Sequence, residues 1–369
     1  ADRGGHRDNA CCGEDGLNDT TNQSITKGTT NMMNWKLGIA ALATALSATA
    51  ATAGPTLDKV KERGRIVCGA SQGTVGFGSP DDKGYWTGLD VETCRAVAVA
   101  IFGDKDKVEF VPLSGQQRIP ALQTGEIDIL PRTLTWTLQR DANGINFTTP
   151  TYYEFTGFMV SKASGVTKVE EMTGASVCVQ TGSTTEVVVN DVSTKLNLQL
   201  NPVVFDNVAA TRQAFFSGRC DALITDAAAL ASVRATQSDN PDDYVIFPAT
   251  KYMDALTPAV RHGDDNWMDI VNWSIQALLN AELYGITQAN IDEMMTSDDP
   301  RVKRFLGVEP GNGKALGLGD EFAYNIVKQL GNYGEIFDRN LGAGSALKIE
   351  RGPNRLFSDG GLMFPMAFQ

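Results

Sequence analysis

Histidine is nearly absent from this chain, and its scarcity removes several chemistries at once. Only His6 and His262 occur among the 369 residues. A metal site built from several histidines is therefore excluded, and Ser-His-Asp or Cys-His catalysis is disfavoured. The segment 311–314 resembles a phosphate loop, but its glycine spacing is wrong and Ala315 stands where Ser or Thr is required. We expect no metal, no cofactor and no enzymatic activity.

Positive charge and long apolar runs are also in short supply. The chain has 32 Lys and Arg against 44 Asp and Glu, a net charge of −12. Nucleic acids and anionic lipids are bound through basic surfaces, so neither is expected as a partner. The apolar run 37–46 is short and rich in Ala and Thr. A membrane-spanning helix needs roughly 20 strongly apolar residues, so we expect no direct membrane insertion.

The same apolar run has the features of an export signal. Met32-Met-Asn-Trp-Lys36 precedes it, and Ala51-Thr-Ala53 after it has the A-x-A form of a signal-peptidase site. We expect residues 32–53 to be a signal peptide that is removed after Ala53. Residues 1–31 are then an upstream extension that is not part of the mature protein.

The cysteines of the mature protein are even in number. Two of the six fall in the extension, which leaves Cys68, Cys94, Cys178 and Cys220. An even number in an exported chain suggests disulfides. Cys68 lies on a predicted strand and Cys94 on the helix that follows, while the other two lie on or beside later strands. We favour the pairs 68–94 and 178–220. Four cysteines allow three connectivities, and four buried free thiols are the alternative.

From residue 57 onward, short strands alternate with amphipathic helices, as in α/β proteins. We expect strands at 65–70 and 108–113, a helix at 88–103 that Asp90 caps and Gly103 ends, a helix around 119–123, and a helical region at 265–306 that a Gly-rich segment at 311–319 breaks. The tail after that break is expected to end in further helices.

An internal repeat indicates two similar lobes. The pattern of residues 121–129, a helix end, a glycine and an Asp before a strand, recurs at 214–222, although strings this short can match by chance. The segments 152–161 and 251–260 are strand-like, so the chain is expected to cross between lobes twice and form a hinge. We place one lobe at 54–157 plus 254–369 and the other at 158–253.

The most informative stretch runs from residue 125 to residue 140. Ile127, Ile129 and Leu130 predict a short buried strand, which leads into threonines, a tryptophan and Arg140. Open α/β sheets bind ligands at the carboxyl ends of their strands. The planar guanidinium of Arg140 can donate two parallel hydrogen bonds to a carboxylate. The alternative is that Arg140 is a solvated loop residue.

The second lobe offers complementary groups. A predicted strand at 176–180 leads through 181–186 into a helix, so that amides and hydroxyls at a helix N-terminus can face an anion. Another strand, at 220–226, ends in the carboxylate of Asp226. Arg140 and a helix N-terminus opposite Asp226 suit a zwitterion. Asp226 could instead cap a helix at 227–233.

These motifs occur in an order that is typical of one family: Gly88-Leu-Asp90, Gly125-x-x-Asp128, Arg140, Gly182-Ser-Thr184, and Asp221 with Asp226. The chain resembles the bacterial extracytoplasmic solute-binding proteins for polar amino acids. The segments 331–337 and 349–352 resemble the general L-amino-acid-binding branch. The resemblance implies the type II periplasmic binding protein fold, an α/β architecture of two lobes with mixed sheets joined by two hinge strands. It also implies a periplasmic monomer that binds L-amino acids, broadly and with a polar preference, and that delivers them to the transmembrane subunits of an ABC permease.

The resemblance also assigns roles to residues. It implies that Arg140, with help from Thr135, Ser183 and Thr184, holds the α-carboxylate of the ligand. It implies that Asp226 holds the α-ammonium group.

The family's side-chain pocket is less closely matched. Thr133 and Arg118 correspond to lining positions in glutamate/aspartate-binding relatives, but Ser71 stands where those relatives carry another arginine, which weakens a strict preference for acidic ligands. No stacking aromatic residue occurs near Gly115, which argues against a specialist for basic amino acids. Trp136 and Phe77 can supply an apolar wall, or they can be core residues.

Two other functions use the same scaffold. An exported enzyme of the cyclohexadienyl or arogenate dehydratase kind needs an acid in the cleft, and Glu154 and Glu186 are the candidates. A sensory module would hand its ligand to a receptor instead of a permease.

Overall fold

The computed structural model describes residues 54–368. The predicted extension at 1–31 and the predicted signal peptide at 32–53 lie outside these residues. Across the described part of the chain, no helix is both long enough and apolar enough to cross a membrane.

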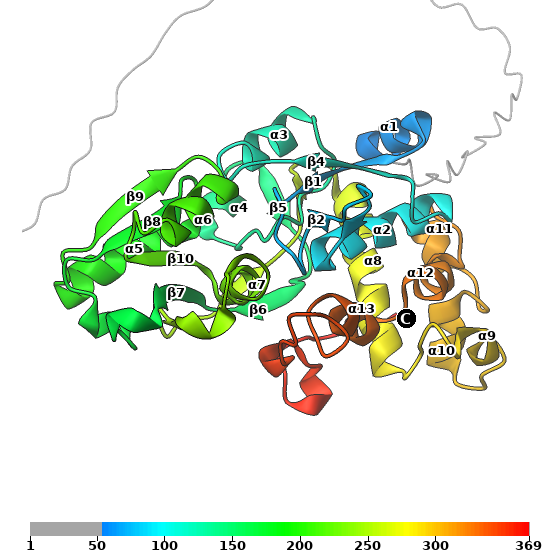
Figure 1. Cartoon of the computed structure of the whole chain (residues 1–369). Helices are drawn as coiled ribbons and strands as arrows, with labels where there is room; N and C mark the ends of the chain where they lie inside the picture. Colours follow the sequence, from blue (N-terminus) through cyan, green and yellow to red (C-terminus); the bar gives the residue numbers. More distant parts are fainter. Residues whose placement is uncertain (1–53, 369) are drawn as a thin grey trace, which may run out of the picture. The chain divides into compact units, whose positions relative to one another are not determined.

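Helices and strands are interspersed up to residue 261, and among the α-helices and strands only helices follow between residues 265 and 340 (Figure 1). The helices are Pro55–Arg63 (α1), Leu89–Phe102 (α2), Arg118–Thr124 (α3), Leu138–Asp141 (α4), Thr184–Leu196 (α5), Val208–Phe216 (α6), Ala227–Gln237 (α7), Asp265–Leu283 (α8), Ile291–Met294 (α9), Pro300–Leu306 (α10), Asn312–Leu316 (α11), Phe322–Leu330 (α12) and Tyr333–Asn340 (α13). The strands are Ile66–Ala70 (β1), Ser79–Pro80 (β2), Trp86–Thr87 (β3), Val108–Pro112 (β4), Ile145–Phe147 (β5), Tyr152–Glu154 (β6), Thr156–Ser161 (β7), Ser176–Gln180 (β8), Asn201–Phe205 (β9), Ala222–Asp226 (β10), Tyr244–Pro248 (β11), Asp254–Leu256 (β12) and Ala259–Arg261 (β13).

One lobe is built on a five-stranded mixed sheet of order β11-β7-β10-β8-β9. Strands β8, β9 and β10 are parallel, whereas β7 is antiparallel to β10 and β11. Side chains alternate along β8: Val177 and Val179 pack into one core with α5, and Cys178 packs into another with α6 and α7. This period of two places one core on each face of the sheet.

The other lobe has a smaller set of paired segments. Strand β1 is parallel to β4, and Cys68 forms a parallel bridge with Ile129. Leu130 bridges Ala259, at the start of β13, which is antiparallel to β5. The predicted strand at 127–130 is thus reduced to these two bridges. Helices α2, α8, α12 and α13 pack on one side in a large core, and α3 packs on the other side.

Two short antiparallel strands, β6 and β12, join the lobes, with Tyr153 opposite Ala255. The C-terminal extension contacts this hinge. Asn354 accepts a hydrogen bond from the Tyr153 backbone N–H at 2.6 Å and donates one to the Tyr153 carbonyl at 3.0 Å. The sheet assignments fit the two-lobe architecture, and the exact boundaries at 157/158 and 253/254 remain a prediction.

Each lobe contains one disulfide. Cys68 on β1 is bonded to Cys94 on α2, and Cys178 on β8 is bonded to Cys220 just before β10. These are the pairs favoured from the sequence. All four sulfur atoms belong to buried residues.

One local expectation is wrong. Asp90 does not cap α2: the N-cap is Gly88, whose φ of 128° and close approach to the Phe77 backbone leave no room for a side chain. Asp90 is instead buried and accepts a hydrogen bond from the Thr133 N–H at 2.9 Å. The Gly-rich segment 311–319 separates α10 from α12, as expected, and contains the short helix α11 at residues 312–316.

Candidate ligand-binding site

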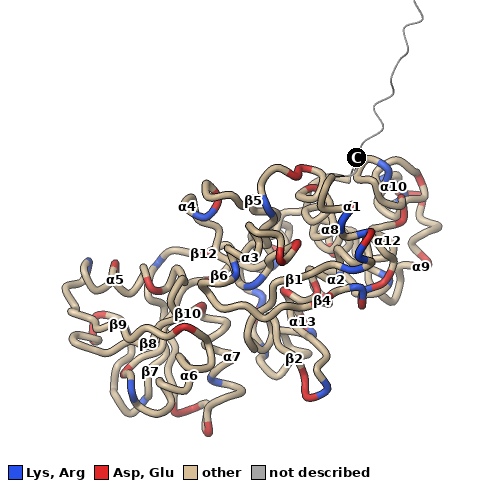
Figure 2. The backbone as a smooth tube through the Cα atoms, turned by 90° about the horizontal axis from the view of Figure 1, so that it is seen from above, with Lys and Arg blue, Asp and Glu red and all other residues tan. Residues whose placement is uncertain are grey.

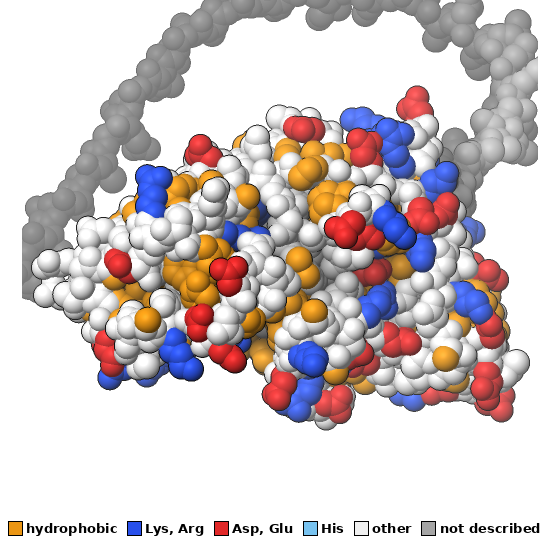
Figure 3. Space-filling view, viewed as in Figure 1, with side chains coloured by type: hydrophobic (Ala, Val, Ile, Leu, Met, Phe, Trp, Pro, Cys, Tyr) orange, Lys and Arg blue, Asp and Glu red, His pale blue; other side chains and the backbone are white. Residues whose placement is uncertain are grey.

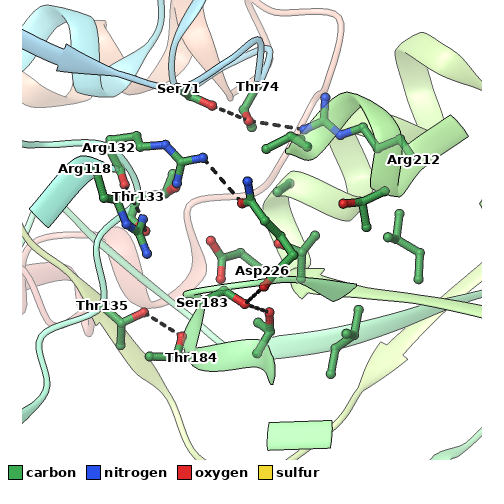
Figure 4. Close-up of a pocket in the computed structure, with 18 residues that line it drawn as sticks. Ser71, Thr74, Arg118, Arg132, Thr133, Thr135, Ser183, Thr184, Arg212 and Asp226 are labelled. Carbon is green, nitrogen blue, oxygen red and sulfur yellow. Dashed lines mark hydrogen bonds between the residues drawn. The ribbon is translucent and has the colours of Figure 1, made fainter. Parts of the chain in front are cut away.

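A cavity lies where the carboxyl ends of parallel strands from the two lobes meet (Figure 4). Ser71 follows β1, Gln180 ends β8 and Asp226 ends β10. Side chains from both lobes line the cavity, as expected for an α/β ligand site. The lining residues are Ser71, Thr74, Arg118, Arg132, Thr133, Thr135, Gln180, Ser183, Thr184, Thr185, Val208, Thr211, Arg212, Leu223, Ile224, Thr225, Asp226 and Ala229.

Three arginines line this cavity, and each is at least nine-tenths buried. The exposed fractions are 3% for Arg118, 4% for Arg132 and 7% for Arg212. Burial lowers the pKa of all three guanidinium groups, and lowers those of Arg132 and Arg212 to about 10. Arg132 and Arg212 therefore stay protonated at neutral pH. Such groups are costly to bury without partners.

Asp226 is the only acidic residue in the lining. It occupies the N-cap position of α7, yet its side chain makes no capping hydrogen bond. Its carboxylate accepts no hydrogen bond from any residue in the range 54–368. Burial, followed by repulsion from Asp254, raises its pKa from 3.8 to about 6, against the attraction of Arg118 and other arginines. Asp226 is thus an unsatisfied, mostly ionised carboxylate at pH 7.

The N-terminus of α5 also faces the cavity. Ser183 is its N-cap residue and accepts a hydrogen bond from the Glu186 N–H at 3.3 Å. The next residue, Thr184, lies with its hydroxyl 3.3 Å from the hydroxyl of Thr135 in the other lobe. Two hydroxyls and the positive end of a 13-residue helix therefore meet at one point.

Side chains of the two lobes are hydrogen-bonded across the cavity and its rim. Gln116 donates to the Thr181 hydroxyl at 3.0 Å, and Arg132 donates to Gln180 at 3.5 Å. Arg212 donates to the Gly73 carbonyl at 2.8 Å. With the Thr135–Thr184 contact, these bonds describe an arrangement in which the lobes are closed on one another.

Thr133 has a strained backbone. Its φ of 34° lies in the left-handed region, which is uncommon for a β-branched residue. The buried carboxyl of Asp90 accepts its N–H, and Arg118 donates to its carbonyl at 3.4 Å. Burial raises the pKa of Asp90 to about 8. Strain of this kind is found where the surrounding structure holds a functional residue in place.

Arg140 lies beside the cavity without lining it. Its guanidinium donates to the Thr135 carbonyl at 2.9 Å. Burial lowers the pKa of Arg140, while Asp226 and Asp254 favour its charged form. It is therefore close enough to these carboxylates to interact with them.

The two aromatic residues proposed for an apolar wall lie elsewhere. Phe77 is 1% exposed and packs edge-on against Tyr152 in the core, because the turn around Gly76 points it inward. Trp136 is 43% exposed and stacks on Phe147, away from the lining. The walls of the cavity are mainly threonines and arginines. Phe77 is therefore a core residue, which was the alternative considered from the sequence.

The sequence reasoning missed Arg132, Arg212 and Thr74. Arg132 had a usable signal, since it directly follows the strand-like segment that led to Arg140. Arg212 had none, because it lies in the middle of α6 and reaches the cavity only when the lobes come together. Nowhere in residues 54–368 do three His, Cys, Asp or Glu side chains gather in a way that could hold a metal ion.

Comparisons with known proteins place this geometry in a family. The family model described as bacterial extracellular solute-binding proteins, family 3, matches residues 66–289. The chain is 48% identical to the general L-amino acid-binding periplasmic protein AapJ of Rhizobium johnstonii over 90% of this chain and 97% of that protein. It is 46% identical to the glutamate/glutamine/aspartate/asparagine-binding protein BztA of Rhodobacter capsulatus over 90% of this chain and 98% of that protein.

A solved structure is equally similar. A periplasmic binding protein of an ABC transporter from Brucella ovis, with glutathione bound, is 47% identical, has a TM-score of 0.83, and is matched over 85% of this chain and 99% of that chain. The two-lobed fold, the cavity between the lobes and these matches lead to one conclusion. The chain belongs to the bacterial extracellular solute-binding proteins of family 3.

Proposed function

We propose that this protein is the periplasmic receptor of an ABC uptake system, which closes its two lobes on an L-amino acid and delivers it to a membrane permease. The relatives support this: one is named for general L-amino acids and another for glutamate, glutamine, aspartate and asparagine. Export through a signal peptide at 32–53, a monomeric state and permease subunits as partners belong to the same proposal.

One observation carries the proposal. The partly buried carboxylate of Asp226 has no hydrogen-bond partner among the described residues, and it faces arginines and a helix N-terminus across the same cavity. An unsatisfied carboxylate opposite cationic groups fits a zwitterion, because the α-ammonium group can pair with Asp226 while the α-carboxylate takes the other side.

We propose the following orientation of the ligand. The α-carboxylate lies between the hydroxyls of Thr135 and Thr184, at the N-terminus of α5, with Ser183 and Arg140 in support. The α-ammonium group pairs with Asp226. Closure is favoured because the ligand contacts both lobes only in the closed state.

The enzyme alternative has weaker support. Glu154 and Glu186, the candidate acids, do not line the cavity. Glu154 is buried in the hinge, where it accepts a hydrogen bond from the Ala228 N–H at 2.8 Å. Glu186 accepts one from the Gly182 N–H at 3.1 Å at the start of α5.

The test is a calorimetric titration of exported protein that has been unfolded and refolded to remove bound ligand. L-amino acids are the panel, and D-enantiomers, arogenate and prephenate are the controls. We expect several L-amino acids to bind with micromolar or tighter affinity, about −8 kcal/mol or better, and the D-enantiomers to fail. Turnover of arogenate or prephenate, or no binding of any amino acid, would overturn the proposal.

A further inference from the structure

We infer that a groove where α2, α12 and α13 come together is a second binding site, and that its ligand is inorganic phosphate carrying one proton. The side chains that matter to the argument are Tyr85, Glu92, Arg95, Lys105, Gln329 and Arg339. No residue of this phosphate groove lines the cavity between the lobes. The inference therefore goes beyond the proposed function and does not depend on it.

The central group of the groove is Arg95, which lies on α2 and is 4% exposed. Its Nε is buried and has no hydrogen-bond partner among residues 54–368. The carboxylate of Glu92 is 4.0 Å from its Nη1, beyond the roughly 3.2 Å that such a hydrogen bond allows. A buried guanidinium with unused donors is costly, which favours the binding of an acceptor.

Aromatic rings position Arg95 without satisfying it. Its Cζ lies over the Tyr85 ring, 4.3 Å from the centroid, and is 5.8 Å from the centroid of the Phe110 ring. A ring attracts the cation through its face, but it does not replace an oxygen acceptor in the plane of the N–H groups. The guanidinium is therefore held in place with donors available to an anion.

Arg339 and Lys105 bring two further positive charges to the groove from other elements. Arg339 lies on α13, is 38% exposed and forms an ion pair with Glu92 at 3.0 Å. Lys105 follows α2, and Gln329 on α12 holds its loop. The Gln329 side chain accepts the Lys105 backbone N–H at 3.1 Å and donates to the Gly103 carbonyl at 2.8 Å. Three separate parts of the chain thus converge on one groove.

The groove has a local excess of positive charge. Three of its lining side chains are cationic and one is anionic, and three minus one leaves two positive charges. The whole chain carries −12, so its composition does not account for this excess. Figure 2 shows basic segments beside α2, whereas basic and acidic side chains are interspersed over the face in Figure 3. A divalent anion balances the excess, and a monovalent one leaves half of it.

Glu92 selects among divalent anions. Its Oε1 pairs with Arg339, but its Oε2 is buried and accepts no hydrogen bond within the described residues. Hydrogen phosphate can donate its proton to Oε2 while its other oxygens accept from Arg95. Sulfate has no proton to donate at neutral pH, so it would place oxygen lone pairs against a carboxylate. This repulsive element favours phosphate over sulfate.

The size of the groove fits a small ion. Its volume of about 230 Å³ is several times the roughly 30 Å³ of one water molecule. It is below the range of about 300–1,000 Å³ for sites that hold drug-sized ligands. Bound phosphate would connect α2 with α13, the helix whose Tyr333 donates to the Thr151 carbonyl at 2.7 Å just before the hinge strand β6.

The experiment is calorimetric titration of refolded, ligand-free protein with sodium phosphate and, separately, sodium sulfate, at pH 7 and at an ionic strength held constant with chloride. We expect phosphate to bind the wild type with a millimolar or lower Kd, and sulfate to bind about tenfold more weakly or worse, because it cannot make the bond to Glu92. In Glu92→Gln this preference should disappear, since an amide can donate to either ion. Arg95→Met should weaken phosphate binding more than tenfold.

Two further variants serve as controls. Lys59→Met removes an exposed cation on α1 that does not line the groove, so its phosphate affinity should equal that of the wild type. Arg132→Met removes an arginine from the cavity between the lobes, where an anion could also bind. Binding that Arg132→Met retains and Arg95→Met loses assigns the ion to the phosphate groove.

Three results would overturn the inference. They are a lack of saturable phosphate binding, sulfate bound as tightly as phosphate by the wild type, and phosphate binding that Arg132→Met loses while Arg95→Met retains it. If Arg95→Met fails to fold, the comparison of phosphate with sulfate in the wild type and in Glu92→Gln still decides the matter. Amino-acid binding is measured separately, so each of these results leaves the proposed function as it stands.

Discussion

Replacing Asp226 by asparagine should make the ligand-free protein more stable while it weakens ligand binding. Burial raises the pKa of Asp226 from 3.8 to about 6. At pH 7 the folded protein therefore holds a carboxylate that is harder to ionise than in the unfolded chain. This rise in the pKa of Asp226 corresponds to about 3 kcal/mol of folding free energy lost at pH 7, because each pKa unit is worth about 1.4 kcal/mol.

The direction of this change in folding stability follows from how many protons each state binds. Between pH 4 and 6 the folded state holds more of the Asp226 proton than the unfolded state, so this group makes wild-type stability rise as the pH falls from 7 through 6. An asparagine is neutral at every pH and nearly the same size. We expect Asp226→Asn to be up to about 3 kcal/mol more stable at pH 7, with the difference shrinking toward pH 4. Asp90 and Glu154 are present in both proteins, but repulsion from Asp226 contributes to the raised pKa of each, so the asparagine lowers these two pKa values as well.

The assay is urea unfolding of refolded, ligand-free protein at several pH values, with calorimetry for the affinity. The asparagine cannot pair with an ammonium group as a carboxylate does, so binding should weaken more than tenfold, because breaking a buried charge contact costs roughly 2–5 kcal/mol. A variant that is less stable than the wild type at pH 7 would refute the reasoning. So would a gain in stability that does not depend on pH.

Three further outcomes are expected. Ligand affinity of the wild type should fall below pH 6 by about tenfold per unit, because only the ionised fraction of Asp226 is competent to bind; an affinity that stays flat from pH 8 to pH 5 contradicts this. Arg140→Ala should weaken L-amino acid binding more than tenfold, as the loss of a buried charge contact does, and unchanged affinity by calorimetry would remove Arg140 from the proposed site. Replacing Cys178 and Cys220 together by serine should cost about 4 kcal/mol of unfolding free energy relative to the oxidised wild type, because the bond closes a loop with a sequence separation of 42 residues. Urea unfolding measures the difference, which should vanish when both proteins are reduced, because reduction also opens Cys68–Cys94 in each.

Local patterns in the sequence predicted the parts of this site that follow strands. Thr133, Thr135, Ser183, Thr184 and Asp226 all line the cavity. Each follows a run of apolar residues at a strand end, where chain direction alone fixes the place of the side chain. Their roles in ligand binding remain proposals.

The sequence could not predict contacts that depend on how the two lobes meet. Arg212 lies on a helix whose own pattern indicates only packing, and its cavity contacts come from the loop around Thr74, more than a hundred residues earlier. The prediction that Phe77 lines the ligand pocket was wrong because its neighbours are glycines, which suggest an exposed turn. The turn instead directs the ring into the core. Asp90 looked like a helix cap because cap signals are local, whereas its actual partner, Thr133, is distant in the chain.

Asn354 has a consequence for the kinetics of uptake. The Asn354 side chain bonds to both the N–H and the carbonyl of Tyr153, as a residue of a neighbouring strand would, and so adds a contact to the hinge between the lobes. Neither residue lines the cavity, so the stiffness of the pivot can be adjusted without altering the fit of any ligand. We expect a substitution at Asn354 to change the rate of lobe opening, and so of ligand release, more than the choice among ligands.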